Sequence, residues 1–352
     1  MAELKILSFG AGAIGTYVGG SLALAGAELV FVEQPAAVDE IRRRGIRLDL
    51  TRDGRRESKG AAILEPSSSV VVTSIPDALR YGAFDAGLFA LKSFDTPAAL
   101  EAMKPFARDL PPILCLSNGV DNEPAIANVL GSDRVIPATV TSAIGRRAAG
   151  DIVLERLRGV GIYSGHPLSP KLIGAANAAL LNARPFANAA AMKWSKMLTN
   201  LMANPTSAIL DMTAAEVYAD PRLYRLEVGM LRECLTVMSA QSIEVVDLPG
   251  TPVRALAAVV RMPFWFSKPI LSRAAGAGRG EKMPSFYIDL HSGRGKSEVE
   301  FLHGAVVRAG RQFGVPTPIN QVLTETLTAL TRGEVPLNEF ARQPEKLLRR
   351  LT

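Results

Sequence analysis

The sequence predicts an α/β domain with a mostly parallel sheet, followed by an all-α domain. Short apolar strands alternate with helices over the first half of the chain, and a glycine-rich turn follows the first strand. From Asn188 onward the pattern is helical and strand signals are weak. At 352 residues the chain is long enough for two cores. We place the boundary near Arg184 and Pro185, which gives domains of 1–184 and 185–352.

The first domain is expected to alternate strand and helix as an open sheet does when helices cover both faces. The expected strands are Leu4–Phe9, Glu28–Val32, Ala86–Ala90, Ile113–Leu116 and Val135–Thr141. The expected helices are Ile14–Ala25, Ala36–Arg44, Thr96–Ala107 and Asn122–Leu130. A hairpin is expected over Ile46–Ala62, turning at Asp53 and Gly54.

The second domain is expected to consist of helices around one irregular segment. The expected helices are Asn188–Ala203, Ala214–Tyr218, Leu223–Ser242, Val299–Phe313 and Gln321–Arg332. Pro249–Pro284 is rich in proline, glycine and basic residues, so we expect it to be irregular.

Composition narrows the class of protein. The chain carries a net charge of +6, but only 6% of its residues are aromatic and its basic clusters lack interleaved aromatics, so no nucleic-acid partner is expected. No apolar stretch is long enough to span a membrane, and the N-terminus does not resemble a secretion signal. Cys115 and Cys234 lie in apolar segments and are expected to be buried thiols. We therefore expect a cytoplasmic protein without a membrane partner.

A glycine motif at the first strand–helix junction predicts a dinucleotide-binding, Rossmann-type domain. It has the G-x-G-x-x-G spacing, with a strand before it and a helix after it. Its first glycine permits a tight turn, the second admits a pyrophosphate, and the third lets the helix pack closely on the sheet. The helix N-terminus attracts the anion. The residues expected to bind the cofactor here are Gly10, Ala11, Gly12, Ala13, Ile14 and Gly15.

Glu33, at the end of the second strand, bears on which dinucleotide is bound. A carboxylate there can accept both ribose hydroxyls of NAD and repels the 2′-phosphate of NADP. Gln34 follows it rather than an arginine, so we expect NADH to be preferred. The alternatives are a solvated strand-end acid, or a phosphate reached by the arginines at 42–44.

Lys92 and Asn118 each follow the end of an expected strand. In a doubly wound sheet that edge forms the ligand crevice, so both are candidate cofactor contacts. A solvated lysine and an asparagine in an Asx turn are the alternatives.

The segment Trp194–Pro205 holds the most informative pattern of the second domain. Lys196, Asn200 and Asn204 are spaced i, i+4 and i+8, which places them along one face of a helix. The residues between them are largely apolar, and a buried lysine and two buried asparagines require partners or a polar cavity. Pro205 should loosen the helix near Asn204. A solvent-facing polar stripe is the alternative.

Glu298 lies in an expected capping box. Ser297 and Glu300 have S-x-x-E spacing, which places Glu298 in the first turn of a helix, where the dipole favours an acid. No metal site is expected, because no cysteine or acid stands at ligand spacing from the histidines at 166, 291 and 303.

Together these segments resemble the ketopantoate reductase family, which reduces 2-dehydropantoate to pantoate with NADPH. The resemblance spans nearly the whole chain, from the glycine turn to G-V-P-T-P-I-N at 314–320. Between them, L-K-S-F-D at 91–95 is similar to the family's V-K-x-x-D, and L-S-N-G-V at 116–120 to its L-Q-N-G-L. The segment 196–205 matches K-x-x-x-N-x-x-x-N-P, while 285–289 and 297–299 resemble S-M-x-x-D and T-E-I.

The resemblance implies a Rossmann-type domain and a helical domain like the C-terminal domain of 6-phosphogluconate dehydrogenase. It implies that Lys196 is the general acid, and that Lys92 and Asn118 lie along the cofactor. The residues implied to hold the keto acid and its hydroxyl are Asn200, Asn204, Ser285 and Glu298, the last counted as catalytic together with Lys196. The implied pathway is pantothenate biosynthesis.

Three departures leave the cofactor and the substrate open. Ser117 stands where the family has glutamine, Ser297 where it has threonine, and Gln34 where it has arginine. An NAD-dependent D-2-hydroxyacid dehydrogenase of mandelate type shares the fold, and Glu33 fits it better. A non-catalytic dinucleotide-binding sensor is the alternative of another class, although it would not need Lys196. The partner is expected to be a small 2-keto acid, and the oligomeric state, monomer or homodimer, stays open.

Overall fold

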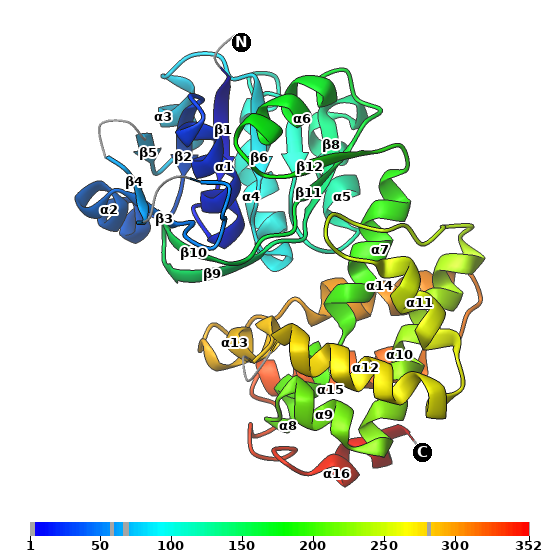
Figure 1. Ribbon diagram of the computed structural model, residues 1–352. Coiled ribbons are helices and arrows are strands. Elements are labelled where there is room, and N and C mark those ends of the chain that lie inside the picture. The colour runs from blue at the N-terminus through cyan, green and yellow to red at the C-terminus, as the bar shows by residue number, and fades with distance from the viewer. Residues whose placement is uncertain (1–3, 57–59, 66–69, 280–282, 352) are drawn as a thin grey trace. The chain divides into compact units, whose positions relative to one another are not determined.

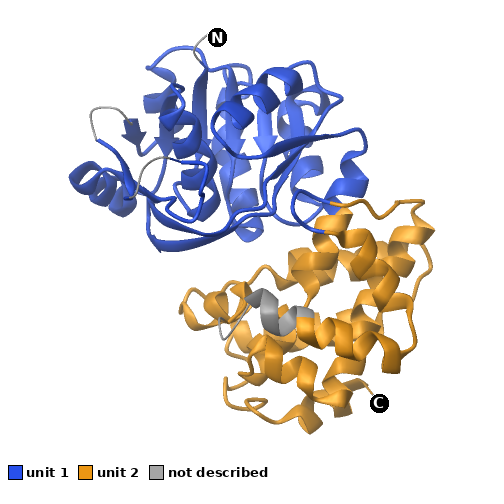
Figure 2. Cartoon of the chain, viewed as in Figure 1, with its two compact units in different colours: residues 1–193, 248–251 blue, residues 194–247, 252–352 orange. Residues whose placement is uncertain are grey.

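The computed structural model describes residues 4–56, 60–65, 70–279 and 283–351. The chain forms two compact units (Figure 2). The first comprises residues 1–193 and 248–251, and the second comprises residues 194–247 and 252–352. The first is an α/β unit, and the described part of the second contains helices and no named strand. The fold class predicted from the sequence is therefore confirmed.

The first unit is built on a twisted sheet (Figure 1). Its strands are β1 (Lys5–Phe9), β2 (Glu28–Val32), β5 (Val70–Val72), β6 (Ala86–Phe89), β7 (Ile113–Cys115), β8 (Val135–Val140), β11 (Val160–Tyr163) and β12 (Ala183–Phe186). Their order is β12-β11-β8-β7-β6-β1-β2-β5, and all neighbours are parallel except β8 and β11. The carboxyl ends of β1, β2, β6 and β7 consequently meet at one edge, as the sequence predicts.

Helices cover both faces of this sheet. They are α1 (Ala13–Leu24), α2 (Pro35–Arg44), α3 (Ile75–Leu79), α4 (Thr96–Met103), α5 (Asn122–Leu130) and α6 (Ser169–Ala178). Successive side chains of β1 point to opposite faces: Ile6 belongs to the core that includes residues of α1 and α6, and Leu7 to the core that includes residues of α3, α4 and α5. Burial on both faces explains why the strands are continuous apolar runs.

A second, smaller sheet packs against α1. It consists of β3 (Ile46–Asp49), β4 (Ala62–Leu64), β9 (Ala143–Ala148) and β10 (Asp151–Arg156) in the order β4-β3-β10-β9. The expected antiparallel pairing of β3 with β4 is present, but its connection runs over residues 50–61, of which 57–59 lie outside the described residues. Asp53 and Gly54 are therefore not the tight turn that the sequence analysis expected.

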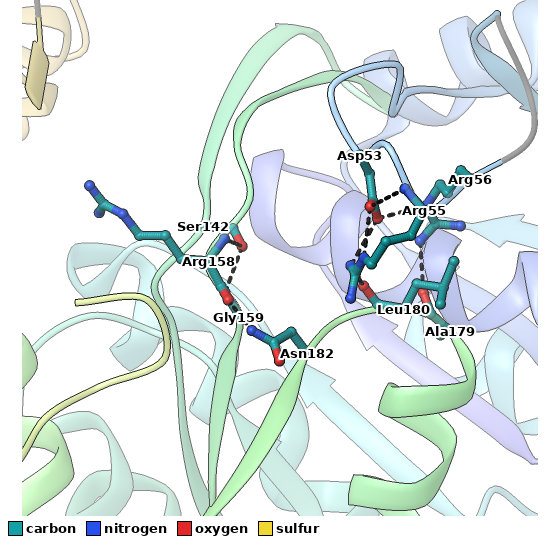
Figure 3. Close-up of polar contacts among 9 residues, drawn as sticks. All are labelled: Asp53, Arg55, Arg56, Ser142, Arg158, Gly159, Ala179, Leu180 and Asn182. Atoms are coloured by element: carbon teal, nitrogen blue, oxygen red, sulfur yellow. Dashed lines mark hydrogen bonds and ion pairs between the residues drawn. The ribbon is translucent and has the colours of Figure 1, made fainter.

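Asp53 instead anchors this connection (Figure 3). Its carboxylate is 2% exposed and lies 2.8 Å from Nε of Arg55 and 3.4 Å from Nε of Arg56. The two guanidinium groups donate in turn to the carbonyl oxygens of Leu180 and Ala179, just after α6. Most of the described loop is exposed, but the buried acid orients two arginines toward the C-terminus of α6 and so ties the loop to the first unit, which is why it does not form a two-residue hairpin turn.

The second unit is helical. Beginning with α7 (Ala189–Leu201), its helices are α8 (Asn204–Leu210), α9 (Ala214–Ala219), α10 (Pro221–Ala240), α11 (Val253–Arg261), α12 (Phe264–Arg279), α13 (Ser285–His291), α14 (Val299–Gln312), α15 (Pro318–Thr331) and α16 (Pro344–Leu348). The expectation that Pro249–Pro284 is irregular is wrong, because most of this segment forms α11 and α12. Its residues 280–282 lie outside the described residues. Pro252 and Pro263 immediately precede these two helices, where no backbone donor is needed, so they begin helices rather than prevent them.

The division between the units also differs from the expected boundary. It falls inside α7, between Lys193 and Trp194, and not at Arg184. Pro185 belongs to β12, at the edge of the large sheet, where a missing backbone donor disrupts no inner ladder. The proline is therefore part of the first unit's sheet and not of a linker.

Two compositional expectations concern the described residues. Both cysteines are free and buried, as expected. Among the helices that the structure describes, none combines the length and the apolarity needed to cross a membrane.

Candidate active site

The glycine turn between β1 and α1 has the steric properties that its pattern predicts. Gly10 has φ of +93°, and a Cβ atom on Gly15 would lie 2.1 Å from the carbonyl oxygen of Gly10. Neither position can hold a larger residue without distortion. A Cβ on Gly12 would meet no atom within 4 Å, so the backbone there is open to a ligand at the N-terminus of α1. This open cradle fits the pyrophosphate of a dinucleotide.

Glu33 lies beside this turn. One carboxylate oxygen accepts a hydrogen bond from the backbone N–H of Ala11 at 2.6 Å, and the other from that of Gln34 at 2.9 Å. The side chain is half-buried and stands at the end of β2, next to β1. The structure thus brings together Glu33 and the glycine turn, as the sequence analysis expected.

The neighbouring arginines are engaged within the fold. Arg42 donates to the carbonyl oxygen of Val71 at 3.0 Å, and Arg44 forms an ion pair with Asp151 at 3.1 Å. Arg43 donates to the carbonyl oxygen of Asp39, one helical turn earlier. These contacts provide structural roles for the arginines that the sequence analysis considered as phosphate ligands.

Lys92 and Asn118 follow the adjacent parallel strands β6 and β7, as expected. The loops that carry them are tied together by the hydroxyl of Ser93, which donates to the carbonyl oxygen of Asn118 at 3.0 Å. The hydroxyl of Ser117 donates to the carbonyl oxygen of Leu91 at 2.7 Å. We call residues 117–119 the Asn118 turn. Its position is coupled to that of the Lys92 loop by these two hydrogen bonds.

A buried ion pair lies under the Asn118 turn, and the sequence analysis missed it. The ammonium group of Lys193 lies 2.7 Å from the carboxylate of Glu123 and donates to the carbonyl oxygens of Ser117 at 2.7 Å and Ala138 at 3.3 Å. The side chain of Lys193 is only 6% exposed. Asn122 completes the support, because its amide donates to the carbonyl oxygen of Asn118 at 2.7 Å.

The ammonium of Lys193 is held in its charged form. Burial alone would lower its pKa, but the adjacent Glu123 carboxylate outweighs burial and raises the pKa above the ordinary 10.5. The sequence did contain a signal, since Lys193 interrupts the apolar run Ala189–Met192 at the start of a helix. Without the fold, however, nothing identifies Glu123 as its partner.

In the second unit, the predicted polar positions do not share one helix. Lys196 and Asn200 are half-buried on α7, but this helix ends at Leu201 and α8 begins at Asn204. Pro205, in the first turn of α8, has no N–H to donate to the carbonyl of residue 201, so α7 cannot continue past it. The expected i+8 position of Asn204 on the same helix is therefore wrong.

Asn204 and Ser285 are nevertheless brought together. The side-chain amide of Asn204 donates to the carbonyl oxygen of Asn200 at 3.1 Å and to the hydroxyl of Ser285 at 3.2 Å. Its side-chain oxygen accepts the backbone N–H of Phe286 at 3.0 Å. We call residues 203–206 the Asn204 turn. Asn204 is 4% exposed and Ser285, the first residue of α13, is exposed, so Asn204 orients a hydroxyl that a ligand can reach.

Glu298 stands at the start of α14, but the expected capping box is wrong. Glu298 is the N-cap residue itself rather than part of the first turn, and it is 2% exposed. Ser297 still contributes, because its hydroxyl accepts the backbone N–H of Val299 at 3.3 Å. The helix begins at Val299, as the helix prediction expected, so Ser297 is not its N-cap, and Glu300 in the first turn makes no reciprocal bond of a capping box.

No group of histidine, cysteine and acidic side chains suited to a metal ion occurs among the described residues. His303 is fully buried, and burial lowers its pKa to about 3. Its Nδ1 lies 2.9 Å from the side-chain oxygen of Asn320. This histidine is a neutral core residue.

Family models match both halves of the chain. Residues 6–165 match the model described as "Ketopantoate reductase PanE/ApbA", and residues 188–331 match its C-terminal model. The chain belongs to the ketopantoate reductase family. The resemblance drawn from the motifs is confirmed, and with it the identification as an oxidoreductase that uses a nicotinamide dinucleotide.

Similarity to curated proteins extends over most of the chain. The 2-dehydropantoate 2-reductase of Archaeoglobus fulgidus is 24% identical over 95% of this chain and 100% of its own. The 2-dehydropantoate 2-reductase of Mesorhizobium japonicum is 28% identical over 90% of this chain and 94% of its own.

Among solved structures, a PanE/ApbA family ketopantoate reductase from Ralstonia eutropha JMP134 has a TM-score of 0.76 at 25% identity, covering 94% of this chain and 99% of its own. A ternary structure of D-mandelate dehydrogenase with NADH and anilino(oxo)acetate has a TM-score of 0.75 at 21% identity. It covers 95% of this chain and 100% of its own. The second likeness shows the fold alone.

Proposed function

We propose that this protein catalyses the NAD(P)H-dependent reduction of 2-dehydropantoate to pantoate. The observation that carries the proposal is the match of both halves to ketopantoate reductase models, together with the open glycine turn. The curated relatives with full-length similarity are named 2-dehydropantoate 2-reductases, which supports this substrate.

When bound, a reduced nicotinamide dinucleotide supplies a hydride to the ketone carbon. Charge then develops on the ketone oxygen, and Lys196 donates the proton that neutralises it. Asn200, Ser285 and Glu298 hold the carboxylate and hydroxyl of the keto acid, and Asn204 fixes the direction of the Ser285 hydroxyl. In the first unit, the glycine turn and Asn118 hold the dinucleotide.

We further propose that NADH is the preferred cofactor, although the resemblance alone implies NADPH. Glu33 lies at hydrogen-bond distance from the glycine turn, where the adenosine ribose of a dinucleotide binds in such domains. A 2′-phosphate placed there would be repelled at a cost of about 1–3 kcal/mol. Arg42 and Arg44, which were considered as ligands of a 2′-phosphate, already contact Val71 and Asp151. Their engagement within the fold supports the preference for NADH.

One assay tests the reaction and the cofactor together. Purified protein is offered 2-dehydropantoate and a panel of bulkier 2-keto acids, each with NADH and with NADPH. Turnover of 2-dehydropantoate with the highest kcat/KM supports the proposal. A higher kcat/KM for an aromatic 2-keto acid would assign it to the mandelate type, and cofactor binding without any turnover would make it a sensor.

The cofactor preference has its own test. Exchanging Glu33 for serine and Gln34 for arginine should shift the ratio of kcat/KM toward NADPH by at least about tenfold, which is ~1.4 kcal/mol. The unchanged protein already working roughly tenfold better with NADPH would refute the assignment of Glu33. Exchanging the exposed Glu28, at the opposite end of β2, for serine is the matched control and should leave the ratio unchanged.

A further inference from the structure

Glu227 of α10 is an acid buried entirely inside the second unit. Its side chain is 0% exposed. One carboxylate oxygen accepts the backbone N–H of Ala203 at 2.7 Å, and the other accepts the hydroxyl of Thr206 at 2.5 Å. Carboxylates are almost never fully buried without partners, and these two contacts identify residues that Glu227 stabilises. Both are in the Asn204 turn.

The Asn204 turn needs such support. Ala203 has φ of +53° in the left-handed region, which is unfavourable for a residue with a Cβ atom. The turn also separates two helices, so its N–H groups have left the ladder of α7 and begin that of α8. Glu227 accepts one of these N–H groups and thereby holds the unfavourable conformation in place.

The two residues that Glu227 holds flank Asn204. Ala203 precedes it and Thr206 lies two residues after it, so the direction of the Asn204 side chain follows from the position of both. Asn204 in turn contacts the hydroxyl of Ser285 and the backbone N–H of Phe286 at the start of α13. The hydrogen bonds of Glu227 and those of Asn204 are therefore linked through the backbone of one short turn, which connects a carboxylate that no ligand can reach to a hydroxyl that one can.

We propose that Glu227 is a positioning residue for recognition of the keto acid: it fixes the Asn204 turn and, through Asn204, the Ser285 hydroxyl. The inference rests on the proposed function, in which Ser285 holds the substrate. Because the hydroxyl contacts the ground state and the transition state alike, loss of its position raises KM for the keto acid more than it lowers kcat.

Glu227→Leu tests the proposal, since leucine has a similar size but no acceptor. We expect KM for the keto acid to rise about tenfold, with kcat within roughly threefold of wild type and an unchanged dissociation constant for the dinucleotide. Glu227→Gln should restore KM to within about twofold, because its oxygen can accept from Ala203 while its amide donates to the Thr206 hydroxyl.

Glu216→Leu is the matched control. Glu216 accepts the backbone N–H of Thr213 at 2.7 Å at the start of α9, so its loss also uncaps a helix of the same unit. It should lower the melting temperature and leave KM for the keto acid unchanged. If Glu227→Leu is not recovered folded, Thr206→Val removes one of the two contacts and should raise KM about threefold.

A wild-type KM in folded Glu227→Leu, or in Thr206→Val where only that variant folds, overturns the inference. So does a tenfold rise that Glu216→Leu reproduces, since the effect would then reflect general destabilisation. If the wild-type protein reduces no 2-keto acid at all, the proposed function fails, and the inference that rests on it is overturned with it.

Discussion

The Asn118 turn and the Asn204 turn each present an asparagine implied in ligand binding, but the fold holds them with opposite chemistry. In the Asn118 turn, donors hold carbonyl oxygens: Lys193 binds that of Ser117, and Asn122 binds that of Asn118. In the Asn204 turn, an acceptor holds a donor, since Glu227 binds the N–H of Ala203.

The difference follows from what each turn interrupts. A chain that leaves the carboxyl end of a strand has carbonyl groups beyond the ladder, and these require donors. A chain that begins a helix has N–H groups without intrahelical acceptors, and these require a carboxylate or a hydroxyl. Buried charged side chains therefore occur at both turns, the cation Lys193 supporting one and the anion Glu227 the other.

The largest expected effect concerns Lys196, which precedes the Asn204 turn on α7. Lys196→Ala should lower kcat by roughly 10²–10⁴, because the developing charge loses its proton donor, while dinucleotide affinity changes little. Lys196→Arg should rescue poorly, since a guanidinium does not release its proton readily. Stopped-flow or steady-state kinetics measure kcat, and fluorescence titration measures cofactor affinity.

Lys104→Ala is the control for this prediction. The side chain of Lys104 is 52% exposed and forms an ion pair with Glu101 on the surface of the first unit. This variant should have normal kinetics. Near-normal turnover in folded Lys196→Ala that binds the cofactor would move the proton donor to another residue, and Lys92 is then the next candidate.

The second expected effect is on stability and separates the two turns. Lys193→Met leaves the Glu123 carboxylate, whose side chain is 12% exposed, without its ammonium partner and should lower the free energy of unfolding by about 3–5 kcal/mol. Adding Glu123→Leu should recover most of this loss, because the ion pair is then replaced by apolar packing. Denaturant unfolding measures both variants.

Lys193→Met should also weaken dinucleotide binding, because the carbonyl of Ser117 loses its donor. This affinity should not recover in the double variant, where that donor is still missing. Full recovery of both stability and affinity would mean that the ion pair contributes only packing under the Asn118 turn, and that the hydrogen bond from Lys193 to Ser117 does not position this turn.

The smallest expected effect tests which ligand each turn serves. Asn122→Ala should raise KM for the dinucleotide about fivefold to tenfold and leave KM for the keto acid unchanged, because it removes a donor from the Asn118 turn. Asn204→Ala should do the reverse, since it frees Ser285. Initial-rate kinetics with each ligand varied in turn measure both constants.

Asn177→Ala is a matched control for both, because Asn177 pairs with the backbone of Ala183 between α6 and β12. It should reduce stability without changing either KM. Parallel changes of both constants in Asn122→Ala or Asn204→Ala would contradict the assignment of one ligand to each turn.

The sequence predicted those features of the site that depend on local order. The glycine spacing fixed the turn after β1, and the apolar runs before Lys92 and Asn118 identified strands whose ends carry ligand-facing residues. It failed over Pro249–Pro284, where prolines were read as a disruption although Pro252 and Pro263 immediately precede helices. The expected interruption at Pro205 is present, as a break between α7 and α8.

The sequence by itself determined the two-part α/β and helical organisation, the dinucleotide turn and the family, because these depend on periodicity and on glycines at fixed spacing. Only the tertiary structure decided that Lys193 pairs with Glu123 and that Glu227 supports Ala203. Partners separated by 70 and 24 residues leave no periodic trace, and a buried charge is read as an exposed one until the fold shows what covers it.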